Sequence, residues 1–329
     1  MLNIRRILMP TDFSASADAA LPWAAHLAQN HGAELQLLCA VPEREPDSWL
    51  QLHDSTDREE TWRVLRHRAE LKLANRESQL PMPTQSAVSE SHGDPSSAIV
   101  SYAEDHGIDL IVMATHGRRG FRRYRLGSVT GEVVRRSTCP VLTVRHDTPE
   151  SSADMTLETI LVPIDFSWYS HLTLTYARAF AAHHGARLQL LHVISETACP
   201  GFHLMQSGLV DQDLSGLELE ARRRMLQLLA EAAGPAVEAS VFVRSGSPSG
   251  EIVRFARSTG SDLILMASHG LGGLLRMMLG SVASHVVHAA PCSVLVSRWG
   301  HDLTPDNASL SSHYAGLQTP GGAGLRPGL

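Results

Sequence analysis

The sequence predicts an α/β fold in which two doubly wound, mostly parallel five-stranded sheets follow one another, each with helices on both faces. Short apolar runs alternate with helix-like segments along the chain, which is typical of parallel sheets. The whole pattern recurs after 153 residues, as in Asp12 and Asp165 (165 − 12 = 153). A repeat of this length indicates two copies of one domain. We expect the domains at residues 1–147 and 157–299, and a Gly- and Pro-rich disordered tail at 300–329.

The composition of the 329 residues is that of a soluble globular protein. Hydrophobic residues make up 43% of the chain and the mean hydropathy is −0.07, so both domains can bury a core. The net charge of −6 argues against a general nucleic-acid binder. No apolar run approaches the roughly 18 residues of a membrane span, and the N-terminus lacks the apolar core of a signal peptide. We therefore expect a cytoplasmic protein without nucleic-acid or membrane partners.

Cysteine and histidine usage indicates neither disulfides nor a metal. The four cysteines form no C-x-x-C pair, which fits reduced thiols. The 18 histidines are scattered, and none shows the spacing of a known metal motif. We expect no metal site, and we expect most histidines to lie at the surface or at an interface.

Five short apolar runs in each repeat are expected to form the strands. Runs of this length suit strands that are covered on both faces. The expected strands are 4–9, 35–41, 84–89, 110–113 and 141–144 in the first repeat, and 159–162, 188–194, 237–243, 263–266 and 294–297 in the second. Charged amphipathic helices are expected between the second and third strands, at about 57–80 and 214–233.

Capping residues mark the ends of the helix that follows the first strand of each repeat. Ser14 and Ser167 are expected to be N-caps, because a serine hydroxyl accepts a hydrogen bond from a helix's first turn. Pro22 is expected to bend the first of these helices or to delay its start. Gly32 and Gly185 are expected to end the two helices.

The helix after the third strand carries a second set of signals. Asp94 and Ser247 each precede a proline, which indicates an N-cap followed by proline at the first helical position. Gly107 and Gly260 are expected just past the C-terminal ends of these helices.

The fourth strand, its loop and the next helix form the stretch around which each repeat is organised, at residues 109–130 and 262–283. In each copy a small residue and Thr-His-Gly or Ser-His-Gly follow the strand, and Gly-Ser comes nine residues later. Glycines and a helix start present backbone N–H groups to an anion. Alternatively, the glycines merely make the bend between strand and helix. Because ligands collect beyond the carboxyl ends of parallel strands, we expect Asp12, Ala40 and residues 113–117 to converge around one crevice.

These motifs together resemble the universal stress protein family. The resemblance rests on the P-T-D-F-S entry, L-L-H-V in the second strand of repeat two, M-A-[ST]-H-G, the nine-residue gap, G-S and the closing P-[CV]-x-V-L strand. It covers both repeats, essentially residues 1–299. Nucleotide-binding members of that family share the pattern G-x-x-G, nine residues, G-[ST]. Here Ala114 and Ala267 stand at its first glycine.

The resemblance implies that ATP, carrying Mg²⁺ or Mn²⁺, binds in one or both repeats. In repeat one the expected contacts come from Thr11, Asp12, Ala40, Met113, Ala114, His116, Gly117, Arg118, Arg123, Gly127, Ser128, Val129 and Thr130. In repeat two they come from Asp165, Val193, Met266, Ala267, His269, Gly270, Gly280, Ser281, Val282 and Ala283.

The roles implied for these residues differ along the nucleotide. The aspartates are expected to meet the adenosine, while Ala40, Val193 and the two methionines line the adenine slot. The glycines, the serines and the residues after the serines are expected to hold the phosphates. Alternatively, Asp12 and Asp165 simply cap the helix that follows them.

The two copies differ in the loop before the Gly-Ser pair. Residues 118–125 contain five arginines, whereas residues 271–278 contain one. The stronger positive field favours repeat one as the site with stronger phosphate contacts, with Arg118 and Arg123 among the groups concerned. A solvated basic loop, or contact with an acidic partner, would explain the arginines equally well.

No catalytic residues are expected. His116 and His269 have no paired base or nucleophile, and no P-loop lysine is present, so at most slow ATP hydrolysis is expected. We expect an ATP-binding stress-response or signalling module. The alternatives are a structural or interaction protein that has lost nucleotide binding, and a slow ATPase. Relatives pair through the fifth strands, so residues 141–144 are expected to meet 294–297 within one chain, or to mediate a homodimer.

Overall fold

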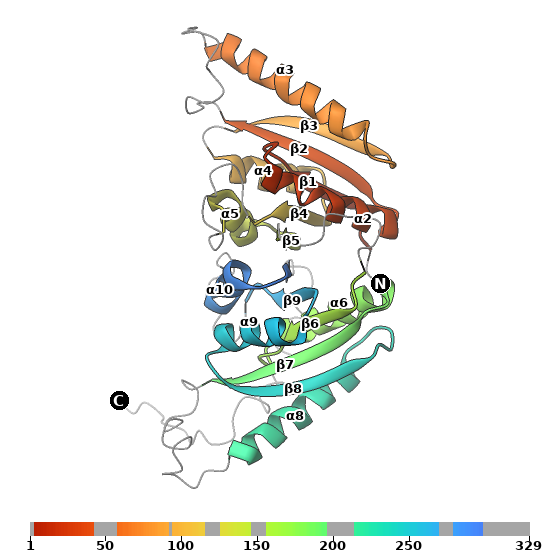
Figure 1. Ribbon diagram of the computed structural model, residues 1–329, viewed down its shortest axis with the longest axis vertical. Helices are drawn as coiled ribbons and strands as arrows, with labels where there is room; N and C mark the ends of the chain where they lie inside the picture. Colours follow the sequence, from red (N-terminus) through yellow and green to blue (C-terminus); the bar gives the residue numbers. More distant parts are fainter. Residues whose placement is uncertain are drawn as a thin grey trace, which may run out of the picture. The chain divides into compact units, whose positions relative to one another are not determined.

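A computed structural model describes residues 3–42, 58–91, 94–115, 126–145, 156–195, 214–269 and 279–298 (Figure 1). Strands and helices alternate in both repeats, as the sequence predicts. The first repeat contains β1 (Arg6–Pro10), α1 (Ala15–Asp18), α2 (Leu21–His31), β2 (Glu34–Pro42), α3 (Arg58–Glu77), β3 (Thr84–Ser91), α4 (Pro95–Asp105), β4 (Leu110–Ala114), α5 (Ser128–Arg136) and β5 (Val141–Val144). The second contains β6 (Thr159–Pro163), α6 (Trp168–His184), β7 (Arg187–Ser195), α8 (Leu214–Glu231), β8 (Ala239–Gly246), α9 (Pro248–Thr259), β9 (Leu263–Ala267), α10 (Ser281–Ala289) and β10 (Ser293–Ser297).

The strands form one ten-stranded sheet in the order β3-β2-β1-β4-β5-β10-β9-β6-β7-β8. Within each repeat the five strands are parallel, which confirms the predicted fold class. The prediction of two separate sheets is corrected in one respect, because β5 and β10 pair antiparallel and join them. Leu142 lies opposite Leu295 in this pairing. The expected meeting of the fifth strands within one chain is thereby confirmed.

Side chains alternate between the two faces of the sheet, as the period of two in a strand requires. In β1, Ile7 and Met9 belong to the same core cluster as residues of α2 and α3. Leu8 faces the opposite way and belongs to the cluster that includes residues of α4 and α5. The winding of the chain therefore reverses between β1 and β4, which is the place where open α/β sheets bind ligands.

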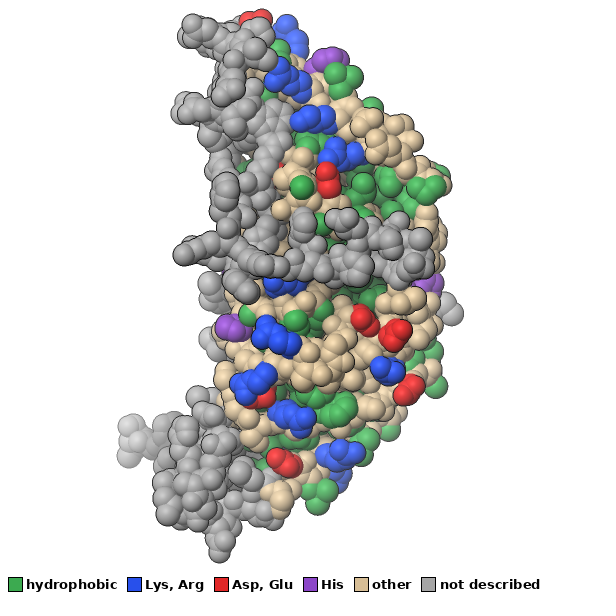
Figure 2. Space-filling model, viewed as in Figure 1, with side chains coloured by type: hydrophobic (Ala, Val, Ile, Leu, Met, Phe, Trp, Pro, Cys, Tyr) green, Lys and Arg blue, Asp and Glu red, His purple; other side chains and the backbone are tan. Residues whose placement is uncertain are grey.

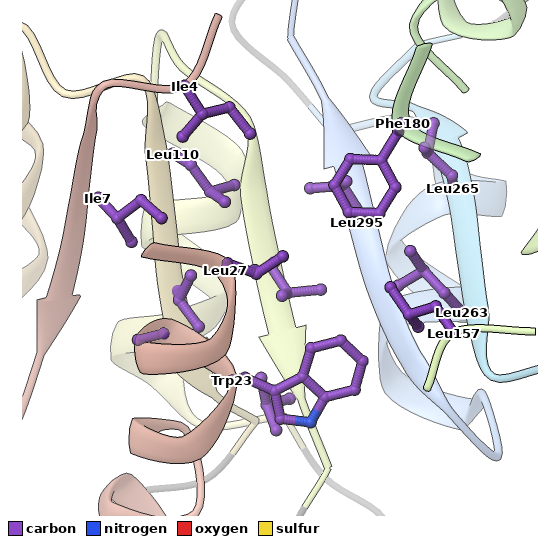
Figure 3. Close-up of a cluster of buried hydrophobic side chains, with 14 of the residues drawn as sticks. Ile4, Ile7, Trp23, Leu27, Leu110, Leu157, Phe180, Leu263, Leu265 and Leu295 are labelled. Atoms are coloured by element: carbon purple, nitrogen blue, oxygen red, sulfur yellow. The ribbon is translucent and has the colours of Figure 1, made fainter. Parts of the chain in front are cut away.

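One apolar cluster contains side chains of both repeats (Figure 3). Trp23 and Leu27 of α2 belong to it together with Phe180 of α6 and Leu295 of β10, and all four side chains are buried. The packing at the junction is therefore continuous with the cores of the repeats. In the part of the chain that the structure describes, no helix combines the length and apolar character needed to cross a membrane.

The first helix of each repeat is capped as predicted. The hydroxyl of Ser14 accepts a hydrogen bond from Ala17 N at 3.1 Å, and that of Ser167 accepts one from Ser170 N at 3.2 Å. Pro22 lies in the first turn of α2, so in repeat one the helix breaks after α1 and restarts, whereas α6 is continuous. Gly32 and Gly185 end these helices in the left-handed conformation, with φ of 61° and 69°.

The second set of caps is confirmed in position but not in every bond. Asp94 accepts a hydrogen bond from Ser96 N at 3.0 Å. Ser247 occupies the N-cap position of α9, but its side chain makes no capping hydrogen bond. Gly260 is the left-handed C-cap of α9, and Gly107 follows the C-cap of α4 with φ of 56°.

The first strand begins at Arg6, two residues later than predicted. The cause is the carboxylate of Asp109, which accepts hydrogen bonds from the N–H groups of Arg5 and Arg6 at 2.8 and 2.9 Å. The same arrangement recurs in repeat two, where Asp262 accepts from the N–H groups of Glu158 and Thr159. These bonds fix the start of each central strand against the helix-to-strand turn that precedes β4 or β9.

Two predictions about chain organisation are not decided by the fold. The chain up to Arg298 forms one compact unit, so the domain limits 1–147 and 157–299 stay predictions. The tail predicted at 300–329 lies outside the described residues.

On the face shown in Figure 2, basic and acidic side chains of the described residues are interspersed.

Two equivalent arginines tie the repeats together at the β5–β10 junction. Arg145 follows β5 and donates to the carbonyl of Ala290 at the end of α10. Arg298 follows β10 and donates to the carbonyls of Val134 and Arg135 in the last turn of α5. A guanidinium at a helix C-terminus satisfies carbonyls that lack helical partners and complements the helix dipole. Burial lowers the pKa of Arg298 to about 10, so the group stays charged at neutral pH.

Replacement of Arg298 by methionine should therefore destabilise the protein. Met keeps the apolar stem but leaves two partly buried carbonyls without a charged donor, so we expect the free energy of unfolding to fall by about 2 kcal/mol. Urea unfolding followed by circular dichroism measures this change. Arg66→Met is the matched control, because Arg66 makes an exposed ion pair with Glu70 and should change stability by less than about 0.5 kcal/mol. Equal losses in the two variants would contradict the role of Arg298.

Candidate functional site

The carboxyl edge of the sheet brings together the residues predicted to form a crevice. In repeat one, β1 lies between β2 and β4, so the segments that follow these strands share one edge. The ladder extends beyond β1, because Thr11 N donates to Leu38 O at 2.8 Å. By continuation of this register, Asp12 lies at the level of Ala40 in β2. Met113 reaches the same edge from β4, on the opposite side of β1. The strand order and register thus place these three residues at one edge of the sheet, while residues 116 and 117 lie outside the described residues.

Asp12 and Asp165 organise the turn that leaves the first strand of each repeat. Oδ1 of Asp12 accepts from Ser14 N at 3.0 Å, and Oδ1 of Asp165 accepts from Ser167 N at 3.0 Å. Asp165 Oδ1 also accepts from the hydroxyl of Ser170 at 2.6 Å. Both side chains are half-buried. One oxygen of each carboxylate thus has a local structural role in the turn, while the helix itself is capped by Ser14 or Ser167, and neither carboxylate is fully buried.

The residue after each aspartate is a feature that sequence reasoning missed. Phe13 and Phe166 have φ of 62° and 61°, and they are the only non-glycine residues with positive φ in the described parts of the chain. The left-handed conformation costs an aromatic residue roughly 1–2 kcal/mol. The same backbone conformation in both copies places the aspartate and the capping serine in one turn. The repeated Asp-Phe-Ser was visible in the sequence, but the backbone conformation was not.

The two phenylalanine rings are covered by cations from the long helices. The guanidinium of Arg76 lies 5.0 Å from the Phe13 ring centre, and that of Arg224 lies 4.5 Å from the Phe166 ring centre. Arg76 also binds the carboxylate of Asp18 at 2.6 Å. Such cation–π contacts offset part of the backbone strain and connect the turn to α3 or α8.

The apolar residues at the carboxyl edge differ between the repeats. Met113 and Met266 are buried at the ends of β4 and β9, Val193 is buried in β7, and Ala40 is half-buried in β2. His192 precedes Val193, and its Nδ1–H donates to the carbonyl of Ile164 at 2.7 Å. Burial lowers the pKa of His192, so its ring is neutral near pH 7. The equivalent residue in repeat one is the smaller Cys39, which is buried.

The Gly-Ser pairs lie at helix starts, as predicted. Gly127 is the N-cap of α5 and Gly280 is the N-cap of α10, and neither cap makes a side-chain hydrogen bond. The first N–H groups of a helix have no partner within the helix, so Ser128 and Ser281, both exposed, stand beside backbone donors. Val129 and Val282 follow them in the first turn and are half-buried. Each helix start therefore has the composition of an anion site.

Backbone hydrogen bonds hold each helix start against the strand that precedes it. Gly127 N donates to Thr115 O at 2.7 Å, and Gly280 N donates to Ser268 O at 2.8 Å. The nine-residue gap thus closes a loop that returns to the carboxyl edge. Close approach also explains the glycine, because a Cβ on Gly280 would lie 3.2 Å from Ser268 O.

Two residues predicted to hold phosphates have side chains that face the protein interior. Thr130 is buried, and its hydroxyl donates to the carbonyl of Ala114 at 2.9 Å. Ala283 occupies the equivalent position in α10 and is also buried. Any contact of these two residues with an anion would therefore come from the backbone N–H. Ala114 is buried and Ala267 is half-buried at the ends of their strands.

The loops between strand and helix are described only in part. His269 is half-buried, and its Nδ1 lies 2.9 Å from the hydroxyl of Ser268. The ring of Tyr169 is 6.1 Å from the His269 ring, between centroids. The remaining predicted loop residues lie outside the described residues: His116, Gly117, Arg118, Arg123 and Gly270.

Substitution of Gly280 by alanine should loosen this helix start. The added Cβ would press against Ser268 O, and alanine is also a poor N-cap, so we expect the free energy of unfolding to fall by about 1–2 kcal/mol. Gly250→Ala is the matched control, because a Cβ there meets no atom closer than 3.8 Å and alanine favours helix α9 by about 0.5–1 kcal/mol. Urea unfolding should thus show changes of opposite sign. A Gly280→Ala variant as stable as the unaltered protein would show that the close approach is not needed.

Comparison with known proteins relates both repeats to one family. Residues 3–145 and 156–298 each match the universal stress protein family. A universal stress protein of Mycobacterium tuberculosis is 32% identical over 195 residues, which are 58% of this chain and 62% of that protein, so the match spans less than two thirds of the relative. A universal stress protein of Mycolicibacterium smegmatis is 26% identical over 302 residues, covering 89% of this chain and 96% of that one. The crystal structure of a universal stress protein from Archaeoglobus fulgidus has the same fold, with a TM-score of 0.65, 22% identity and coverage of 91% of this chain and 100% of that chain. The chain belongs to the universal stress protein family.

Proposed function

We propose that the chain binds ATP at the carboxyl edge of one or both repeats and acts in the cytoplasm as a stress-response or signalling module. The observation that carries the proposal is the same convergence in both copies. In each copy a half-buried aspartate lies in a strained turn at one edge of the sheet. The N-terminus of a helix reaches the same edge, at the point where the winding reverses.

The chemistry of the edge fits the parts of ATP. A carboxylate accepts hydrogen bonds from sugar hydroxyls, and Asp12 and Asp165 present one at the start of the crevice. Buried methionine and valine side chains suit the faces of a purine. The helix starts at Ser128 and Ser281 supply N–H donors for phosphates. Mg²⁺ or Mn²⁺ would arrive with the nucleotide and be held mainly by phosphate and water.

The repeats need not bind equally well. The five arginines of residues 118–125 favour repeat one, because they raise the positive potential near the phosphates. Repeat two has the bulkier pair His192 and Val193 at its adenine wall, where repeat one has Cys39 and Ala40. We propose stronger phosphate contacts in repeat one and a closer apolar wall in repeat two.

A second candidate is an interaction protein that has lost nucleotide binding. The use of Asp12 Oδ1 and Asp165 Oδ1 within their own turns favours it, because a structural aspartate needs no ligand. Alanine in place of glycine at positions 114 and 267 favours it too. The slow-ATPase alternative is supported only by the loop histidines, and phosphate release at the background rate with Mg²⁺ or Mn²⁺ would exclude it.

The double variant Asp12→Asn, Asp165→Asn separates the ligand-binding role from the structural one. Asparagine keeps the oxygen that accepts from Ser14 N or Ser167 N, so the turn survives, but the charge that strengthens a bond to the ribose is lost. We expect ATP affinity, measured by isothermal titration calorimetry, to fall by about 10-fold or more. Thermal unfolding without nucleotide should change little.

Asp105→Asn is the control for this variant, because Asp105 lies at the exposed end of α4, away from the carboxyl edge of the sheet. Its affinity for ATP should equal that of the unaltered protein. Unchanged ATP affinity in the double variant, or absence of ATP binding by the unaltered protein at millimolar concentration, would favour the interaction protein instead.

The double variant Arg118→Ala, Arg123→Ala tests the phosphate role of the basic loop. If these guanidinium groups contact phosphates, affinity for ATP should fall by about 10-fold while affinity for adenosine stays the same. Arg276→Ala, the single arginine in the corresponding loop of repeat two, is the matched comparison and should have the smaller effect. If the double variant and the unaltered protein bind ATP equally well, the two arginines do not contact the phosphates. The loop is then either solvated or a binding surface for an acidic partner.

A further inference from the structure

Three histidines from the two repeats meet where helices α2 and α6 end. His31 is the last residue of α2, and His183 and His184 are the last two residues of α6. The C-terminal ends of these two helices contact each other at the junction of the repeats. His31 and His184 are equivalent positions, since 184 − 31 = 153, the spacing that relates the repeats. The pairing of β5 with β10 therefore brings two equivalent imidazoles together.

The rings are close enough to share one ligand. The ring centres of His31 and His183 are 4.1 Å apart, and those of His31 and His184 are 5.3 Å apart. One ring nitrogen of each of the three residues lies within 4.8 Å of the other two. Nitrogens around one tetrahedral Zn²⁺ stand about 3.3–3.4 Å apart, given Zn–N bonds of about 2.0–2.1 Å. The His31 and His183 rings are stacked with an interplanar angle of 13°, so binding of one ion requires these rings to rotate and the nitrogens to approach one another by up to about 1.5 Å.

Two ring nitrogens of the cluster are buried without a hydrogen-bond partner. Nε2 of His31 and Nε2 of His184 are shielded from solvent and make no hydrogen bond. A buried polar atom left unsatisfied is destabilising, so native proteins rarely keep one without a reason. Two such atoms beside each other, both able to donate a lone pair, point to a bound cation.

The third imidazole is oriented as a metal ligand usually is. Nε2 of His183 lies 3.0 Å from the carbonyl of Asn30, and a carbonyl can only accept, so Nε2 carries the proton. Nδ1 of His183 then has the lone pair. Metal-binding histidines typically donate their other N–H to a carbonyl or carboxylate in this way. The amide of Asn30 also donates to Nε2 of His26 at 2.8 Å, which commits that nitrogen of His26 to another bond.

Burial affects the protonation of two of the three histidines. Burial, with contributions from the neighbouring histidines, lowers the pKa of His31 to about 4 and that of His184 to about 3. Both rings are therefore neutral at pH 7, and neutral imidazole is the form that coordinates a cation.

We propose that His31, His183 and His184 form a site for a divalent transition-metal ion, Zn²⁺ foremost, that bridges the two repeats. Three imidazole nitrogens match the preference of Zn²⁺, and His183 is exposed, so water can fill the fourth position. This proposal departs from the expectation that the chain has no metal site. The proposed metal site is separate from the candidate nucleotide site at the carboxyl edge. Metal binding there does not depend on nucleotide binding. A metal that binds only the folded chain would stabilise the junction of α2 with α6.

The test is calorimetric titration of ZnCl₂ into the full chain after removal of metal with a chelator. We expect one equivalent to bind, and we expect affinity to fall by at least 10-fold in His183→Ala. His183 is exposed, so its loss leaves no core cavity, and metal-free thermal unfolding should match that of the unaltered protein. His288→Ala is the matched control, because His288 is also an exposed histidine in the last turn of a helix.

A second readout reports on coordination itself. Co²⁺ in place of Zn²⁺ should give the visible absorption of a low-coordinate site in the unaltered protein and in His288→Ala, and much weaker absorption in His183→Ala and in His31→Gln. Zn²⁺ should likewise raise the unfolding temperature of the first two proteins only. Zn²⁺ binding of equal strength in all four proteins, or no binding of one equivalent by the unaltered protein, would overturn the proposal and leave the three rings as packing at the junction.

Discussion

The antiparallel pairing of β5 with β10 is the contact on which the arrangement of the molecule depends. Each strand would otherwise be an apolar edge with unpaired backbone groups, which is a template for aggregation. The pairing covers both edges and places Leu142 opposite Leu295. The hydroxyl of Thr143 adds a bond to the carbonyl of Val294 at 3.1 Å. Once this register is set, equivalent residues near the junction must meet. The reciprocal helix-end contacts of Arg145 and Arg298 are one consequence.

Much of the fold was predictable because its signals are local. The apolar run of β4, the serine caps and the C-terminal glycines of α2 and α6 act within a few residues, so a single sequence shows them. The β5–β10 contact was expected only through the resemblance to relatives. Strands pair at a sheet edge through backbone N–H and C=O groups, which every sequence has, so the pattern of side chains does not reveal this contact. The late start of β1 was missed because Asp109, about a hundred residues away, takes the N–H groups of Arg5 and Arg6.

The candidate site was predicted in part, for the same physical reason. Sequence placed Asp12, Ala40 and Met113 at one edge, because parallel strands put their carboxyl ends together. It could not show that Oδ1 of Asp12 is committed to its own turn, or that Phe13 takes a left-handed conformation. These two features belong together. A strained turn persists only where its surroundings hold it, and the carboxylate and the guanidinium stacked on the ring do so. An aspartate that is already fixed in this way can meet a ligand without further loss of freedom.

Differences between the copies matter most where the repeats face each other. At such a junction every residue near the axis lies beside its own equivalent, so identical side chains would meet in pairs, as His31 and His184 do. The next position breaks the symmetry, because repeat one has Asn30 where repeat two has His183. A histidine at position 30 would compete with His183 for the same space. It could orient a neighbouring ring only through its backbone carbonyl. Asn30 instead uses its backbone carbonyl to orient His183 and its side chain to hold His26. Divergence after duplication therefore turns a paired contact into a three-sided cluster, which no spacing within either copy could reveal.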